Sequence, residues 1–307
     1  MSKLIDDAKA PCGSPVYSLL TLISLLLLAC AAAAQSTAYN QAVLADLPVA
    51  FWDVNATGAT EPDLSGYGNT GTYVGGTPTH STLPNGNSVS VFNGSTQYLT
   101  IPSNASFSIP RTGNLTWEAW IQPSTLQFPN NLSGYVDYLG KCVEYSPSCE
   151  WEARMYNLTN KAKRPNRLSA YVFNPGAGLG SGAYWQPVSG LFSAGEWLHV
   201  VGEYTINSTP AGCSTTYPGY ISIWVNGVQW NMSYHTPTGC MSQYKIKPQA
   251  NNSPLNIGTV SLDSWFQGAI GKVAIYNYLL TPSQIVNHYT VMTGKQPTGS
   301  CTNTCTF

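Results

Sequence analysis

Charged side chains are scarce in this sequence. Asp, Glu, Lys and Arg make up 9% of the 307 residues, against about 25% in ordinary soluble domains, and the net charge is −1. Without an excess of Lys and Arg the chain is not built to meet phosphates, which excludes the usual nucleic-acid-binding classes. A surface this poor in charge repels its neighbours weakly, so we expect attached sugar or self-assembly to keep the protein in solution.

Long apolar runs are also missing, except near the N-terminus. Residues 16–34 read VYSLLTLISLLLLACAAAA, follow lysines and end in small residues before Gln35. This pattern predicts a signal peptide over residues 1–34 and therefore a secreted protein. Two alternatives stay open. One is an uncleaved membrane anchor, since a spanning helix needs about 20 apolar residues; the other is lipid attachment at Cys30, which follows Leu-Leu-Ala.

Cysteine spacings typical of zinc sites are absent. No Cys-x2-Cys pair occurs, and an exported chain is more commonly cross-linked by disulfides. Many pairings of the cysteines that follow the signal peptide are conceivable, and neighbours in sequence are the simplest partners. The prediction is three disulfides, namely Cys142–Cys149, Cys213–Cys240 and Cys301–Cys305.

Asn-x-Ser/Thr sequons, in contrast, are abundant. They accept N-linked glycans in exported proteins, and such glycans would supply the hydration that the missing charges do not. A β protein rich in Asn, Ser and Thr also produces sequons by chance, which is the alternative explanation. The candidates are Asn55, Asn93, Asn104, Asn114, Asn131, Asn157, Asn207, Asn231 and Asn251.

Short β-strand patterns fill residues 38–292 without a linker, which predicts one all-β domain. Asn226-Gly227 between two apolar runs predicts a type I′ hairpin turn. One helix is predicted near the end, because Thr281, Pro282 and Gln284 form an N-terminal capping box and Gly294 can end the helix. The clearest strand candidates are residues 88–91, 98–101, 115–121, 198–204, 220–225 and 269–276.

Six stretches of the sequence, taken in order, resemble segments of the LamG-like (concanavalin A-like) jelly-roll family. The matching segments are AFWD at 50–53 with DLSGYGNTGTYVGG at 63–76, VFNGSTQYL at 91–99, LTWEAWI at 115–121, GEWLHVV at 195–201, IWVNGV at 223–228, and LNIG at 255–258 with the strands and helix that follow. The resemblance implies a two-sheet antiparallel jelly-roll sandwich with one short C-terminal helix, spanning residues 35–294. Residues near 142–189 and 207–217 read as insertions in that frame, and residues 295–307 as a tail stapled by its two cysteines.

The family also contains glucanases, so a carboxylate pair is the catalytic arrangement to look for. Glu150 and Glu152 would share one face of a strand. Their neighbours do not match the glucanase pattern, and two exposed acids beside Lys141 and Arg154 is the favoured interpretation. Glu118, in a family strand, is expected to be structural. The four histidines are scattered, and His199 is expected to pack inside a strand, so no catalysis is expected.

Relatives in this family often bind calcium at the rim of the sandwich. Oxygen ligands suited to calcium are available at Asp53, Asp63 and Asn69. Lys272 stands in a C-terminal segment, Ile270 to Val273, where the family usually carries acids, which argues against the site. The alternative for Asp63 is a loop carboxylate that accepts hydrogen bonds from backbone N–H groups.

Tryptophans at family strand positions are expected to pack in the core. The aromatic residues outside those positions are the candidates for stacking on sugar, namely Trp151, Trp185, Trp230 and Trp265, with Tyr184 and Tyr244. Lys161, Lys163, Arg164 and Arg167 form the basic cluster of the sequence; it could meet acidic glycans, although such runs are usually solvated loops.

Two functions of different class follow. The first is a secreted, non-catalytic module that recognises carbohydrate or a cell-surface partner. The second is a glycosylated subunit that assembles with copies of itself into an extracellular filament or coat. A glycoside hydrolase is the third and weakest alternative.

Overall fold

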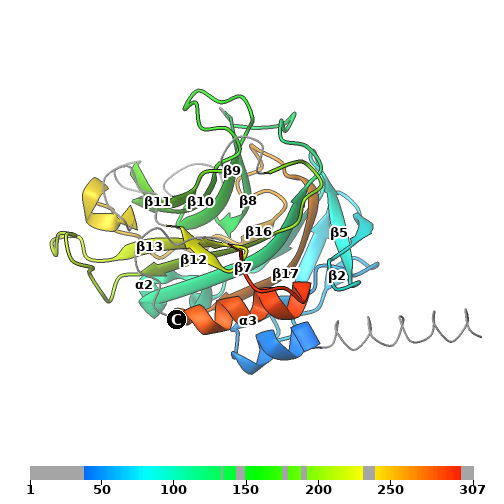
Figure 1. Cartoon of the computed structure of the whole chain (residues 1–307), viewed down its shortest axis with the longest axis horizontal. Helices are drawn as coiled ribbons and strands as arrows, with labels where there is room; N and C mark the ends of the chain where they lie inside the picture. The colour runs from blue at the N-terminus through cyan, green and yellow to red at the C-terminus, as the bar shows by residue number, and fades with distance from the viewer. Residues whose placement is uncertain are drawn as a thin grey trace, which may run out of the picture.

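Two antiparallel sheets face each other and enclose the main core (Figure 1). This computed structural model describes residues 38–132, 134–142, 149–174, 179–187, 192–230 and 239–298. The predicted fold, a jelly-roll-like sandwich with a short C-terminal helix, is confirmed. Short 3-10 and helical turns, η1 (Ala105–Phe107), α2 (Ile109–Thr112) and η3 (Met241–Tyr244), lie between strands.

The first sheet has nine strands within the described residues. Seven run in the order β14 (Val228–Trp230), β13 (Tyr220–Val225), β12 (Leu198–Thr205), β7 (Asn114–Pro123), β17 (Gln267–Tyr276), β5 (Ser88–Asn93) and β4 (Thr79–Thr82). In addition, β1 (Ala50–Trp52) pairs with β17 and β15 (Gly239–Cys240) pairs with β13.

The second sheet has eight strands within the described residues. Their order is β11 (Leu179–Trp185), β10 (Leu168–Asn174), β9 (Trp151–Tyr156), β8 (Tyr135–Lys141), β16 (Leu255–Ile257), β6 (Tyr98–Ile101), β3 (Gly71–Val74) and β2 (Thr60–Glu61). Three of these strands, β9 to β11, come from the predicted insertion near 142–189. That segment therefore extends the sheet and does not only decorate its rim.

Alternation along each strand decides which side chains enter the core. In β7, Trp117, Ala119 and Ile121 pack between the two sheets. Trp120, on the opposite face, belongs to a second core on the outer side of the nine-stranded sheet. Both faces of this central strand are thus buried, although polar residues such as Thr116 and Glu118 interrupt its apolar sequence.

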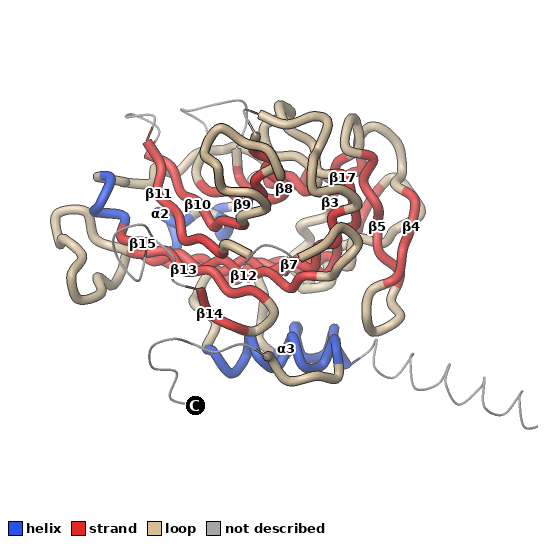
Figure 2. The backbone as a smooth tube through the Cα atoms, turned by 45° about the horizontal axis from the view of Figure 1, so that its top comes forward, coloured by secondary structure: helices blue, strands red, loops and turns tan. Residues whose placement is uncertain are grey.

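The second core lies under two helices. Residues 38–45 are helical, which the strand-dominated interpretation of the sequence did not predict. Tyr39 and Val43 of that helix pack with Ile285 and Met292 of α3 (Pro282–Thr293). Figure 2 shows α3 on the side of β7 and β12 that faces away from the other sheet. No helix among the described residues is long and apolar enough to cross a membrane.

The local signals at α3 and at the hairpin are confirmed. Thr281 and Gln284 form the reciprocal capping box, and Gly294 ends the helix in the left-handed conformation. Asn226 and Gly227 have φ values of 53° and 76°, as a type I′ turn requires. The six predicted strands lie within β5, β6, β7, β12, β13 and β17.

Candidate functional site

The outer face of β8 to β11 carries an unusual concentration of aromatic and charged side chains. In β9, Trp151, Ala153 and Met155 enter the core, so Glu152 and Arg154 point to the other side. The same alternation places residues from β8 and β10 beside them. We call this group the outer-face cluster; its members are Tyr135, Asp137, Glu152, Arg154, Tyr171 and Phe173.

Arg154 is the centre of the outer-face cluster. Its Nε donates to Asp137 Oδ1 at 3.1 Å, and its terminal nitrogen donates to Glu152. The guanidinium carbon lies 4.1 Å from the centre of the Tyr171 ring and 5.2 Å from that of Tyr135. Burial disfavours the charged guanidinium, but Asp137 and the surrounding tyrosines outweigh this effect, so the pKa of Arg154 is raised. Arg154 is therefore a fixed cation, 14% of whose side chain is exposed.

Tyr171 lies against glycine backbone. Gly182 is its partner across β10 and β11, and Gly180 is the next residue on that face. A Cβ added at Gly180 would overlap the Tyr171 ring, and one at Gly182 would approach the ring to 2.8 Å. The two glycines thus make room for a ring lying along the sheet, and the Arg154 guanidinium holds that ring in place while it stays half-buried.

A second arginine extends the aromatic surface towards β11. The Arg167 guanidinium carbon lies 4.9 Å from the ring centre of Tyr184 and 5.8 Å from that of Tyr156, and its Nε donates to Gln186 at 3.0 Å. Tyr156 meets Tyr135 edge to face at 4.8 Å. Half-buried tyrosines therefore lie on β8, β10 and β11, whereas Tyr156 on β9 is buried.

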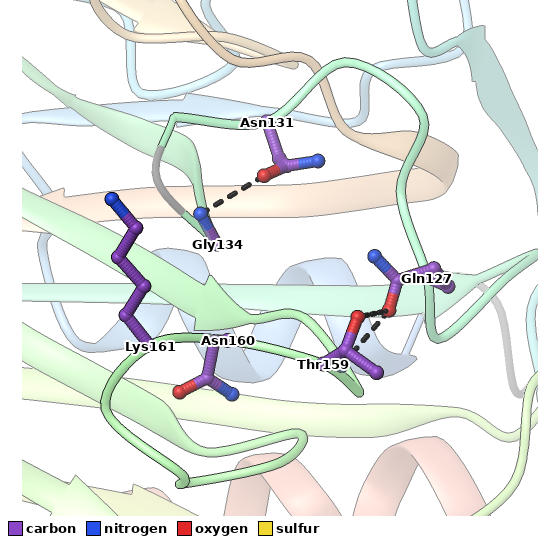
Figure 3. Close-up of a pocket in the computed structure, with 6 residues that line it drawn as sticks. All are labelled: Gln127, Asn131, Gly134, Thr159, Asn160 and Lys161. Carbon is purple, nitrogen blue, oxygen red and sulfur yellow. Dashed lines mark hydrogen bonds between the residues drawn. The ribbon is translucent and has the colours of Figure 1, made fainter.

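A shallow, open depression of about 520 Å³ adjoins this surface (Figure 3). It is formed by the loop before β8 and the loop after β9, and its lining is polar. Gly134 precedes Tyr135 directly, and the N–H of Asn157, the residue after Tyr156, donates to Gly134 O at 2.9 Å. The lining residues are Gln127, Asn131, Gly134, Thr159, Asn160 and Lys161.

The structure separates the predicted sugar-stacking residues into several places. The prediction is wrong for Trp151, which is 0% exposed on the inner face of β9 and donates its indole N–H to Phe107 O. Trp185 is 8% exposed and packs edge to face with Trp230 against the main core. Tyr184 lies on the outer face beside Arg167, and Trp265 is half-buried against Tyr98.

The two carboxylates considered for glycoside hydrolysis are buried, not exposed as predicted. Glu150 accepts from Ile109 N–H at 2.6 Å and lies 3.9 Å from Lys141 Nζ, while Glu152 is bound to Arg154. Burial, partly opposed by Lys141, raises the pKa of Glu150 to about 7. Such a pKa would suit a general acid, but a side chain with 0% exposure cannot touch a substrate.

Glu118 is structural, and the histidines are less scattered than they look in the sequence. One Glu118 oxygen lies 3.1 Å from His199 Nε2 and 3.0 Å from His288 Nδ1, and the other accepts from Tyr276 at 2.7 Å. Burial acts against the charge, but the two histidines outweigh it and lower the pKa of Glu118. This buried group, which we call the carboxylate–histidine clasp, fixes α3 to the nine-stranded sheet.

The three predicted calcium ligands do not fit a shared ion. Asp53 forms an ion pair with Lys272 at 2.8 Å. Asp63 accepts from the backbone N–H groups of Phe51, Ser65 and Asn69, which is the alternative role foreseen for it. Asn69 Oδ1 accepts from an asparagine side chain. Within the described ranges, no group of three or more His, Cys, Asp or Glu could hold a metal.

Two of the predicted disulfides, Cys142–Cys149 and Cys213–Cys240, are confirmed. Among the sequons, Asn93 and Asn207 are exposed, Asn55, Asn104, Asn114, Asn131 and Asn251 are half-buried, and Asn157 is fully buried. The prediction that Asn157 carries a glycan is therefore wrong for the folded protein. Its side-chain Oδ1 accepts a hydrogen bond from Phe128 N–H inside the fold. Several predictions concern residues outside the described part of the chain. These residues are the signal peptide with Cys30, Asn231, Cys301, Cys305 and the side chain of Tyr244.

Sequence reasoning missed the centre of the outer-face cluster. Tyr171 and Phe173 alternate with Ala170 and Val172, and this is the available signal: aromatic residues at every second position opposite small apolar ones. The pairing of Tyr171 with Gly182 depends on register across β10 and β11, which the sequence does not display.

Comparison with known proteins agrees with the fold. The family model for the concanavalin A-like lectin/glucanases superfamily matches residues 93–286, more than half of the chain. The chain therefore belongs to this superfamily. No curated protein matches it.

Several solved structures share the fold. The binding domain of Paraclostridial Mosquitocidal Protein 1 is similar with a TM-score of 0.55 and 16% identity over 80% of this chain and 52% of that one. The binding domain of botulinum neurotoxin DC, solved in complex with SialylT, gives 0.53 and 13% over 81% and 52%. The receptor-binding domain of the botulinum neurotoxin C/D mosaic serotype gives 0.54 and 12% over 80% and 51%. The chain thus spans about half the length of these domains.

Proposed function

We propose that this protein is a carbohydrate-recognition module that binds its ligand on the outer face of β8 to β11. The observation that carries the proposal is a row of half-buried tyrosines on this face, Tyr135, Tyr171 and Tyr184, held in place by Arg154 and Arg167. Aromatic rings offer sugars a flat apolar surface, and a few fixed polar groups beside them set orientation. Arg154, 14% of whose side chain is exposed, supplies such a group beside Tyr171.

The fold supports this proposal in general terms. The superfamily is named for lectins and glucanases, and one structural neighbour was solved in complex with SialylT. Those neighbours are binding domains of larger proteins, so the substrate and partners of this chain are argued from its own residues.

We propose recognition without turnover. Glycoside hydrolysis needs two carboxylates that reach the substrate from a shared groove. Glu150 is fully buried against Lys141, and Glu152 is bound to a permanent cation. The self-assembling subunit remains a prediction from composition alone.

We further propose that the module is secreted. The apolar run at 16–34, two disulfides and exposed sequons at Asn93 and Asn207 support this location. Mass spectrometry of the mature protein should find an N-terminus near Gln35. An intact Met1 terminus with free thiols would contradict the proposal.

The binding proposal is tested by Tyr171→Ser on a microarray of neutral and acidic oligosaccharides. The wild type should bind a subset of these glycans, and Tyr171→Ser should weaken that binding by about fivefold or more, as loss of an aromatic contact of about 1–3 kcal/mol implies. Tyr67→Ser is the matched control, because Tyr67 is 70% exposed in a different loop and should leave binding unchanged. A circular dichroism melt checks that both variants fold. Equal binding by the two variants would contradict the proposed site.

A further inference from the structure

The depression beside the outer-face cluster is formed by two loops that hold each other in place. Gln127 Oε1 accepts from Thr159 N at 2.9 Å and from Thr159 Oγ1 at 2.8 Å. Asn131 Oδ1 accepts from Gly134 N at 2.9 Å, and Asn160 Oδ1 accepts from Arg164 N at 3.1 Å. The walls are therefore fixed by hydrogen bonds within the protein before any ligand arrives.

The polar groups of the depression that these hydrogen bonds leave available to a ligand are mainly donors. Asn131 and Asn160 also use their amide nitrogens, donating to Phe128 O at 2.9 Å and to Asn157 O at 2.7 Å. Gln127 uses only its oxygen in the hydrogen bonds above, which leaves its NH₂ group directed away from Thr159 (Figure 3). Lys161 supplies an ammonium on the other side of the depression in the same view.

The charge that lines the depression is positive. No carboxylate lines the depression, and within the described ranges Lys161 takes part in no ion pair. Lys163 follows on the same exposed loop. The nearest acids of the outer-face cluster, Asp137 and Glu152, are occupied by Arg154. An ammonium and an amide donor without a local acid favour an anionic group.

The depression is continuous with the aromatic surface. Tyr135 follows Gly134 at its edge, and the Arg154 guanidinium carbon lies 5.2 Å from the Tyr135 ring centre and 4.1 Å from that of Tyr171. A ligand lying on Tyr171 can therefore reach the depression across Tyr135 and Arg154. The depression is shallow and open, and its volume of about 520 Å³ exceeds what a single ion needs.

We infer that the depression is a subsite for an acidic sugar unit, a monosaccharide carrying a carboxylate, within the oligosaccharide that the aromatic surface binds. Lys161 pairs with the carboxylate, and the Gln127 amide donates to it or to a neighbouring hydroxyl. This inference rests on the proposed function and adds the ligand's charge to it.

The test uses two matched pairs of probes in isothermal titration calorimetry with the full chain. One pair is 3′-sialyllactose and lactose; the other is trigalacturonate and its methyl ester. The wild type should bind the acidic member of at least one pair about tenfold more tightly, and raising the salt concentration should reduce that preference. Lys161→Gln should abolish the preference and leave binding of the neutral member unchanged. Gln127→Leu should reduce the preference by a smaller factor.

Lys163→Gln is the matched control, because it removes the same charge from the same loop at a residue outside the lining. The inference is overturned if Lys161→Gln keeps the preference, if Lys163→Gln abolishes it equally, or if the wild type binds neutral and acidic members alike. In each of these outcomes saccharide binding and its loss in Tyr171→Ser would still stand. If the folded wild type binds no saccharide of the microarray or of these pairs, the proposed function fails and the subsite with it.

Discussion

The two outer faces of the sandwich contain similar residues and use them differently. On the nine-stranded sheet, Glu118 is surrounded by two histidines and aromatic rings, and the terminal helices cover the whole group. On the eight-stranded sheet, Arg154 is surrounded by two carboxylates and aromatic rings, and these rings stay half-exposed.

The difference shows what a cover does to a charged centre. Beneath α3, the contacts of Glu118 with His199 and His288 are fully desolvated, so they hold one packing arrangement and offer nothing to a ligand. On the other face, Arg154 is fixed by the same kind of contacts but keeps an exposed edge. A charged aromatic cluster of this type acts as a clasp when covered and as a recognition surface when open.

The largest expected effect comes from breaking the carboxylate–histidine clasp. Glu118→Gln removes the charge that His288 and His199 face, and loss of one partner from a buried pair costs about 3–5 kcal/mol in the free energy of unfolding. Urea unfolding measures it. Glu196→Gln, at an exposed position, is the control and should stay within about 0.5 kcal/mol of wild type. A similar small change in Glu118→Gln would remove the contrast between the two faces.

A smaller effect concerns the pH dependence of stability through Glu150. Its pKa in the folded protein is about 7, above its ordinary value of 4.5, so folding favours the protonated carboxyl. The contribution is complete below pH 4.5 and is lost as the pH rises through about 7. The wild type should therefore lose roughly 2–3 kcal/mol between about pH 5 and pH 8, relative to Glu150→Gln.

Unfolding in urea at several pH values checks this expectation. Glu196→Gln should follow the wild-type curve, since its side chain is exposed. Parallel curves for the wild type and Glu150→Gln would show that the buried carboxyl is ionised throughout.

The smallest effect on stability is expected at Gly180. An alanine Cβ there would overlap the Tyr171 ring, which can turn aside because it is a side chain at a half-exposed position. Gly180→Ala should cost about 1 kcal/mol or less and still weaken saccharide binding clearly, because the ring leaves its place. Gly58→Ala, where no atom lies within 4 Å of the added Cβ, is the control. Unchanged binding in Gly180→Ala would show that the flat ring is not the contact surface.

Much of the fold could be predicted from the sequence because its signals are local. The capping box at Thr281 and the turn at Asn226-Gly227 depend on a few adjacent residues, and both occur as expected. The strand motifs follow the family order. The helix over residues 38–45 was missed.

The site was harder to predict, because the face of the sheet on which a side chain lies depends on strand register. Trp151 and Glu152 are neighbours, yet one enters the core and the other points outward, and a shift of one residue would exchange them. The clasp joins Glu118 to residues 81 and 170 positions away, a relation that no local pattern contains. Of the predicted sugar-stacking residues, Tyr184 lies on the outer face, whereas Trp151 lies in the core.

The helix-covered face also determines from which side of the domain the two ends of the described chain leave. The helix over residues 38–45 and the segment after α3, where Pro297 lies against Gly227, both belong to the nine-stranded sheet's outer side. Both ends of the described chain thus leave from the side opposite to β8 to β11 (Figures 1 and 2). Anything joined to either end, whether a tether, a neighbouring domain or a solid support, would hold the aromatic surface facing away from the point of attachment.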